Sequence, residues 1–80
     1  MEKAEVHIFE DSSIVAFLSI KKFKITPQNA DTGKVVFAVE GPDINKALAA
    51  LYNNEKVGAL DLIKAVKFMR SSIFALKAAR

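Results

Sequence analysis

The chain contains few side chains able to carry out acid–base, nucleophilic or metal chemistry, and their spacing assembles no known site. His7 is the only histidine, and there is no cysteine to supply a thiolate or a disulfide. A metal site would need further ligands converging on His7. The nearby acids Glu5, Glu10 and Asp11 follow no known ligand spacing. We therefore expect His7 to be an exposed residue of an edge strand.

The hydroxyl groups and glycines point to structural roles. Ser12 and Ser13 lack the strand–turn–helix context of a nucleophile elbow, and as neighbours of Asp11 they are explained as helix-capping residues. Three scattered glycines make no phosphate-binding loop. We expect no catalytic, cofactor-binding or metal site, no cofactor and no small-molecule substrate. The chain is predicted not to be an enzyme.

Basic residues are the main candidates for binding. After Asp61 the chain has no acid but five of its twelve Lys and Arg residues, so the net charge of +3 arises in this segment. A second cluster surrounds Phe23, and lysines beside an aromatic ring can hold single-stranded nucleic acid. Strand alternation, however, turns Phe23 toward the core, which leaves a solvated lysine edge as the other interpretation. The candidate anion or nucleic-acid contacts are Lys21, Lys22, Lys24, Lys64, Lys67, Arg70 and Lys77.

The last predicted helix carries more apolar surface than one core-facing stripe requires. Its seam consists of Leu62, Val66, Met69, Ile73 and Leu76. At about 100° per residue, Phe68 lies well away from that seam. A single exposed Phe needs no explanation, but one grouped with small residues suits contact with a second chain. The candidate oligomer interface is Phe68, Ser72, Ala75 and Ala79.

Hydrophobic periodicity and turn residues predict the elements that position these side chains. We expect one compact α+β domain over residues 1–80: a small antiparallel β-hairpin packed with three helices, and an N-terminal run as a candidate third strand, in the order (β)αββαα. The predicted strands cover 5–9, 23–26 and 34–40, with the last one central because it is apolar on both sides. The predicted helices cover 14–20, about 43–52 and about 59–78. Pro27 is expected to end the second strand before a turn over 28–33. Asp43 is expected to cap the second helix, and the Tyr52 ring to be half-buried at its end.

The order of these signals resembles a family of small bacterial and phage domains of unknown function, over about residues 9–76. The resemblance rests on Phe17-Leu18-Ser19-Ile20-Lys21-Lys22-Phe23-Lys24-Ile25, on Val35-Val36-Phe37-Ala38-Val39, on Ala50-Leu51-Tyr52-Asn53-Asn54 and on a basic-x-x-basic-aliphatic rhythm in the last helix. That family has glycine where this chain has Lys22, at a left-handed helix end where lysine is mildly strained. The resemblance implies the fold and no catalytic residues.

Composition favours an interaction partner. An apolar content of 51% is high for an 80-residue monomer. The charged N-terminus is unlike a signal peptide, and no segment is apolar enough to span a membrane, so we expect a cytoplasmic protein without a membrane partner. We predict a non-enzymatic protein–protein interaction module that is homo-oligomeric through its last helix. The alternative is a nucleic-acid-binding accessory protein that uses the basic residues.

Overall fold

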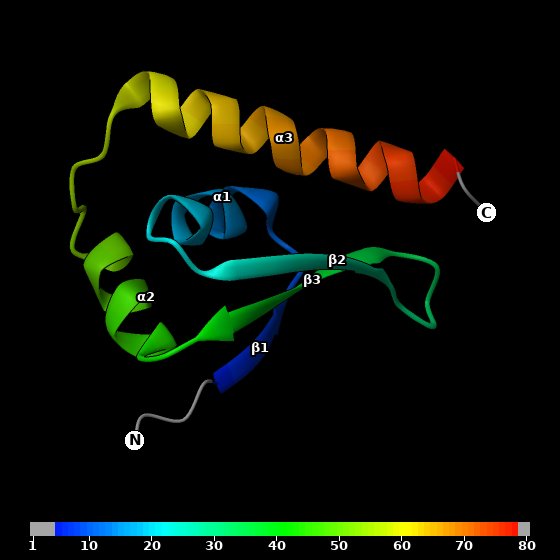
Figure 1. Ribbon diagram of the computed structural model, residues 1–80, viewed down its shortest axis with the longest axis horizontal. Helices are drawn as coiled ribbons and strands as arrows, with labels where there is room; N and C mark the ends of the chain where they lie inside the picture. The colour runs from blue at the N-terminus through cyan, green and yellow to red at the C-terminus, as the bar shows by residue number, and fades with distance from the viewer. Residues whose placement is uncertain (1–4, 79–80) are drawn as a thin grey trace.

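The structure, a computed structural model, describes residues 5–78 and contains three strands and three helices (Figure 1). In chain order they are β1 (Glu5–Phe9), α1 (Ser12–Ile20), β2 (Lys24–Asn29), β3 (Val35–Gly41), α2 (Ile44–Tyr52) and α3 (Ala59–Ala78). The predicted α+β class and the order (β)αββαα are confirmed, and the candidate third strand is a strand of the sheet.

The three strands form one antiparallel sheet in the order β1-β3-β2. The predicted central position of β3 is confirmed. Phe37 pairs with Phe9 on one side and with Pro27 on the other, and this row belongs to the face that packs inward. The adjacent row, with Ala38 between Ile8 and Thr26, belongs to the opposite face of the sheet. Period-2 alternation thus sends Phe37 and Val39 into the core.

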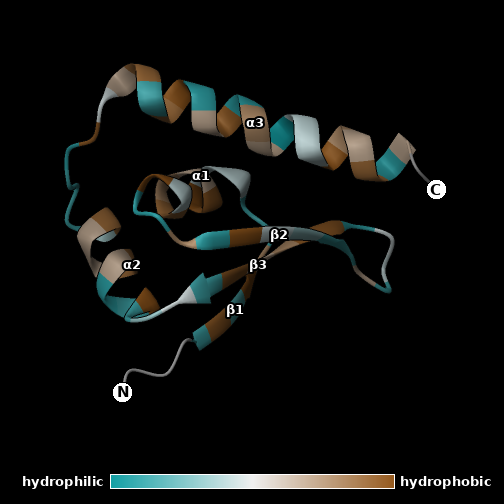
Figure 2. Cartoon of the chain, in the orientation of Figure 1, coloured by the Kyte–Doolittle hydropathy of each residue, from teal (hydrophilic) through white to brown (hydrophobic). Residues whose placement is uncertain are grey.

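The helices lie mainly on one side of the sheet. α1 packs between the sheet and α3, while α2 lies at one end of the strands (Figure 1). Because α1 is covered on two sides, Val15, Ala16, Phe17 and Leu18 are all buried, although they point in different directions around the helix. Hydrophobic and hydrophilic residues alternate along α3 in Figure 2, and only Met69 of this helix is buried. α1 is therefore the central element of the core.

The ends of α1 are closed by local hydrogen bonds. Asp11 is the N-cap, and its Oδ1 accepts from the backbone N–H of Ser13 at 2.8 Å. At the other end Lys22 has φ 73°, donates its N–H to the Ser19 carbonyl, and is followed by a bond from the Phe23 N–H to the Leu18 carbonyl. This pair of bonds is a Schellman motif. Lys22 therefore occupies the left-handed position that glycine favours.

Several local expectations are wrong. Pro27 lies inside β2 and does not end it, because β2 is an edge strand whose outer side needs no N–H donor. The strand therefore continues to Asn29, into the segment expected to be a turn. Asp43 makes no side-chain cap because its backbone is left-handed, with φ 57°. The Tyr52 ring, expected to be half-buried, is exposed since it follows the packed part of α2.

Candidate interaction surfaces

α3 packs on α1 through the predicted seam. Met69 is buried at its centre, and Leu62, Val66, Ile73 and Leu76 are half-buried. Leu62, Val66 and Ile73 contact the core formed by α1 and the sheet. The inward side of the helix is therefore the side that its 4,3,4,3 spacing predicts.

The outward side of α3 carries large apolar residues. The exposed fractions are 61% for Leu60, 51% for Ile63, 66% for Phe68 and 74% for Phe74. At about 100° per residue, Leu60, Ile63 and Phe74 fall within an arc of about 60°. We call these three residues the outer stripe. Phe68 lies about 80° beyond Leu60, on another side of the helix.

The residues of the predicted oligomer interface share the Phe68 side of α3. Phe68 and Ala75 are exposed, and Ser72 is half-buried with its Oγ donating to the Phe68 carbonyl at 3.0 Å. Ala79 lies outside the described residues. Phe68, Ser72 and Ala75 are spaced four and three residues apart, so they form one continuous strip along the helix.

The predicted basic residues divide into separate groups. Lys64, Lys67, Arg70 and Lys77 are all exposed on α3. Lys21 instead forms an ion pair with Glu55 and lies 5.8 Å from the centre of the Phe17 ring, which ties the end of α1 to the connection between α2 and α3. Its side chain therefore has a structural role within the domain.

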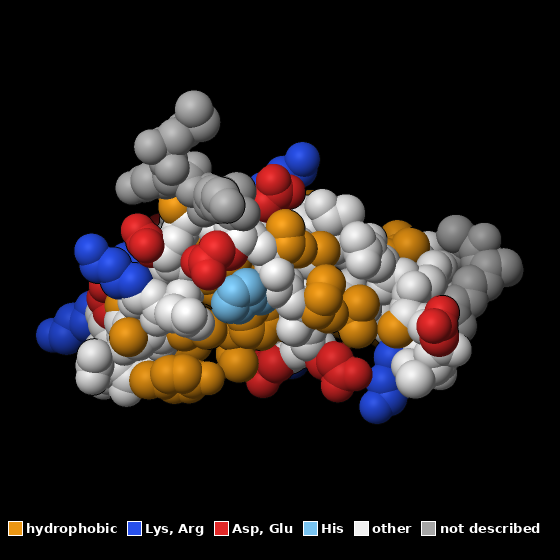
Figure 3. All heavy atoms as spheres, turned by 90° about the horizontal axis from the view of Figure 1, so that it is seen from below, with side chains coloured by type: hydrophobic (Ala, Val, Ile, Leu, Met, Phe, Trp, Pro, Cys, Tyr) orange, Lys and Arg blue, Asp and Glu red, His pale blue; other side chains and the backbone are white. Residues whose placement is uncertain are grey.

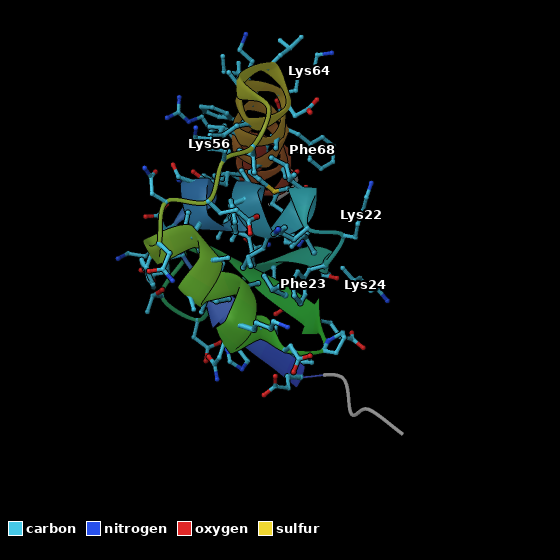
Figure 4. All side chains as sticks on the ribbon, turned by 90° about the vertical axis from the view of Figure 1, so that its left-hand side faces the viewer. Lys22, Phe23, Lys24, Lys56, Lys64 and Phe68 are labelled. Atoms are coloured by element: carbon cyan, nitrogen blue, oxygen red, sulfur yellow. The ribbon has the colours of Figure 1, made fainter. Side chains whose placement is uncertain are left out.

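Lys22 and Lys24 project to the same side of the molecule as Phe68, with Lys64 above them (Figure 4). Phe23, between the two lysines in sequence, points inward, as alternation predicts. A Cβ placed on Gly41 would lie 2.5 Å from the Phe23 ring, which shows how closely the ring meets the β3 backbone. Phe23 is thus unable to stack on an external base.

The face of the sheet turned away from α1 exposes apolar residues that the sequence analysis did not single out. Val6 is 58% and Ile8 57% exposed, and they neighbour the buried Ala38 and the half-buried Val36. We call these four residues the open sheet face. Figure 3, seen from below in the orientation of Figure 1, shows hydrophobic side chains in the middle of the surface, beside the histidine, with Asp, Glu, Lys and Arg side chains around them. The sequence signal was the pair Val6 and Ile8 on one side of β1, opposite His7 and Phe9.

The described residues offer little for metal or covalent chemistry. No group of three or more His, Asp or Glu residues among them could hold a metal ion. His7 is half-buried on the edge strand β1, 3.9 Å from a Glu5 oxygen and stacked on Phe9. No helix in residues 5–78 is both long enough and apolar enough to cross a membrane.

Two surface hollows of about 300 Å³ lie beside α1, one at its C-terminal end and one along Ser13, Ile14 and Phe17. One contains Lys21 and Glu55, already joined as an ion pair, together with Lys46 and Asp43. The other is mainly apolar and lies between α1, α3 and the loop before α3.

Comparisons with protein-family models, curated proteins and solved structures gave no match. The resemblance to small bacterial and phage domains therefore stays a prediction. The surfaces of the folded chain are the basis for a functional proposal.

Proposed function

We propose that this chain is a non-enzymatic, cytoplasmic protein–protein interaction module that self-associates through α3. The observation that carries the proposal is the exposure of four large apolar side chains, Leu60, Ile63, Phe68 and Phe74, on one helix. Scattered apolar residues are normal on protein surfaces. In α3, however, Met69 alone is buried although the helix is rich in apolar residues, so much of its apolar surface is available for contact with another chain. Burying these groups against another chain removes that area from water.

Light scattering coupled to size exclusion tests self-association. The expected result is a mass above that of the 8.8 kDa chain that rises with concentration. The substitutions Phe68→Glu and Phe74→Glu place a charge on either side of the exposed surface, and at least one of them should lower the mass while leaving the circular dichroism unchanged. A clean monomer of wild-type protein at high micromolar concentration contradicts the proposal.

A second candidate function is binding of single-stranded nucleic acid. The observation that favours it is the common orientation of Phe68, Lys22 and Lys24, with Lys64 above them (Figure 4). An exposed aromatic ring can stack on a base while the lysines contact phosphates. Phe68 takes the role that the inward-facing Phe23 is unable to fill.

Fluorescence anisotropy with a labelled single-stranded oligonucleotide tests this second function. Binding should weaken steeply with salt, and Phe68→Ala should weaken it at every salt concentration because a stacking contact is lost. Tyr52→Ala, which removes an equally exposed aromatic ring elsewhere, is the matched control. Absence of binding at about 50 mM salt removes this candidate.

A further inference from the structure

We infer that α3 of one copy packs on the open sheet face of a second copy, so that the chain associates head to tail. This inference rests on the proposed self-association and names the surface that receives the helix. The two surfaces lie toward opposite ends of the molecule: α3 is at the top and β1 at the bottom in both Figure 1 and Figure 4. One copy is therefore able to present both surfaces to different neighbours.

The open sheet face is suited to a helix. An antiparallel sheet with one face in water ordinarily alternates apolar and polar residues, and β2 does so with the outward Lys24, Thr26 and Gln28. β1 differs, because its outward residues are Val6 and Ile8. Helix-on-sheet packing is the usual way to cover such a surface.

The outer stripe places apolar side chains toward both ends of α3, with the exposed Lys67 on the same side of the helix between Ile63 and Phe74. Leu60, Ile63 and Phe74 lie along one side of a 20-residue helix, which is about 30 Å long. The strands it would cross are spaced about 4.8 Å apart, so the helix spans the whole three-stranded sheet.

Two copies could pair α3 with α3, sheet with sheet, or α3 with the sheet, and the charges on these surfaces favour one of the three. The exposed side chains of α3 include Lys64, Lys67, Arg70 and Lys77 against the single acid Asp61. Pairing α3 with α3 would bring two such rows within a Debye length of about 8–10 Å, where like charges repel. A symmetric helix-to-helix dimer is therefore disfavoured.

The region around β1 has the opposite charge. Residues 5–11 contain Glu5, Glu10 and Asp11 and no Lys or Arg. On the open sheet face Glu40 lies between Val6 and the cation Lys24, so this face is mainly but not wholly acidic. Sheet-to-sheet pairing would set acids against acids, whereas α3 on the sheet sets cations beside acids. The head-to-tail arrangement is the pairing in which both apolar surfaces are covered and the charges are complementary.

A head-to-tail contact uses two different surfaces, so each copy keeps one of each kind free. Such heterologous contacts continue until a ring closes or a filament forms. The scattering mass of the wild-type protein should therefore pass that of two chains as concentration rises. The two halves of the contact can also be disabled separately.

The decisive experiment is a complementation test by light scattering. Phe74→Glu disables the helix surface and Ile8→Lys disables the sheet surface, and each variant alone should associate at least about tenfold more weakly than wild type. An equimolar mixture should form a one-to-one species of two chains and stop there, because each variant supplies the surface that the other lacks. Tyr52→Glu and Tyr52→Lys make the same charge changes at an equally exposed site and should associate as wild type does.

Each contrary outcome has a defined meaning. If Phe74→Glu dissociates the protein while Ile8→Lys and Val6→Lys do not, α3 packs elsewhere, and the head-to-tail inference fails while self-association through α3 stands. If both variants are monomers but their mixture stays monomeric, the inference fails as well. A monomeric wild-type protein overturns both proposals. Circular dichroism of each variant confirms that it is folded.

Discussion

Lys22 holds a backbone conformation that favours glycine. Its φ of 73° closes the Schellman motif after α1, and its side chain is exposed. A residue with a Cβ loses about 1 kcal/mol in this conformation. We expect Lys22→Gly to raise the free energy of unfolding by about 0.5–1 kcal/mol, as measured by urea denaturation.

Two controls isolate the backbone effect at Lys22. Lys22→Ala removes the same charge but keeps a Cβ, so it should give no gain. Asn54 occupies the same left-handed position after α2, with φ 60°, and asparagine tolerates it better than lysine does. Asn54→Gly should therefore stabilise less than Lys22→Gly does. Equal gains from Lys22→Ala and Lys22→Gly would show that charge, and not φ, sets the cost.

Gly41 is required for a different reason, because the Phe23 ring occupies the space of a side chain. An added Cβ would meet ring carbons at 2.5 and 2.8 Å. We expect Gly41→Ala to lower the free energy of unfolding by about 1–3 kcal/mol through overpacking. Replacing Phe23 by Leu in the Gly41→Ala background should recover part of that loss. An additive double variant in a thermodynamic cycle would contradict the contact.

At the scale of the element, α1 is the helix that contributes the most buried residues to the core. Leu18 is fully buried between the sheet and α3, so Leu18→Ala should lower the free energy of unfolding by about 2–5 kcal/mol. Ile8 is a comparable side chain on the open sheet face, and Ile8→Ala should cost far less at concentrations where the protein is monomeric. Similar losses in the two variants would mean that Ile8 is covered within the monomer.

Sequence patterns predicted the elements well but their surroundings less well. The seam of α3 follows from residue spacing alone, whereas the left-handed conformation of Lys22 was not predictable from a residue that this conformation disfavours. The exposure of Val6 and Ile8 was not predicted either, because only the tertiary fold decides that α1 covers the side of β1 that carries His7 and Phe9. Pro27 was misjudged because its effect depends on whether a strand is central or at an edge.

The surroundings of the predicted interaction residues were likewise only partly predictable from sequence. Exposure of Phe68 follows from helix geometry, but the role of Lys21 depends on Glu55, which is distant in sequence. The pair forms only after α1 and the segment following α2 meet in the fold. The sequence alone therefore did not indicate that Lys21, a candidate anion contact, forms an ion pair with Glu55.

At the scale of the whole molecule, self-association should couple stability to concentration. Folding and assembly both bury apolar surface, so mass action raises the thermal midpoint as protein concentration increases. We expect this rise for wild type in differential scanning calorimetry, and none for Phe74→Glu over the same range. A midpoint that is independent of concentration in both proteins would contradict the coupling.

The position of α1 beneath α3 has a consequence for biosynthesis. α1 leaves the ribosome early, whereas α3, the last of the described elements along the chain, follows only after both later strands and α2. Until α3 has emerged, Val15 to Leu18 lack one of the layers that bury them. The core is therefore incomplete until α3 has been synthesised, and α1 exposes apolar residues on the side that α3 later covers.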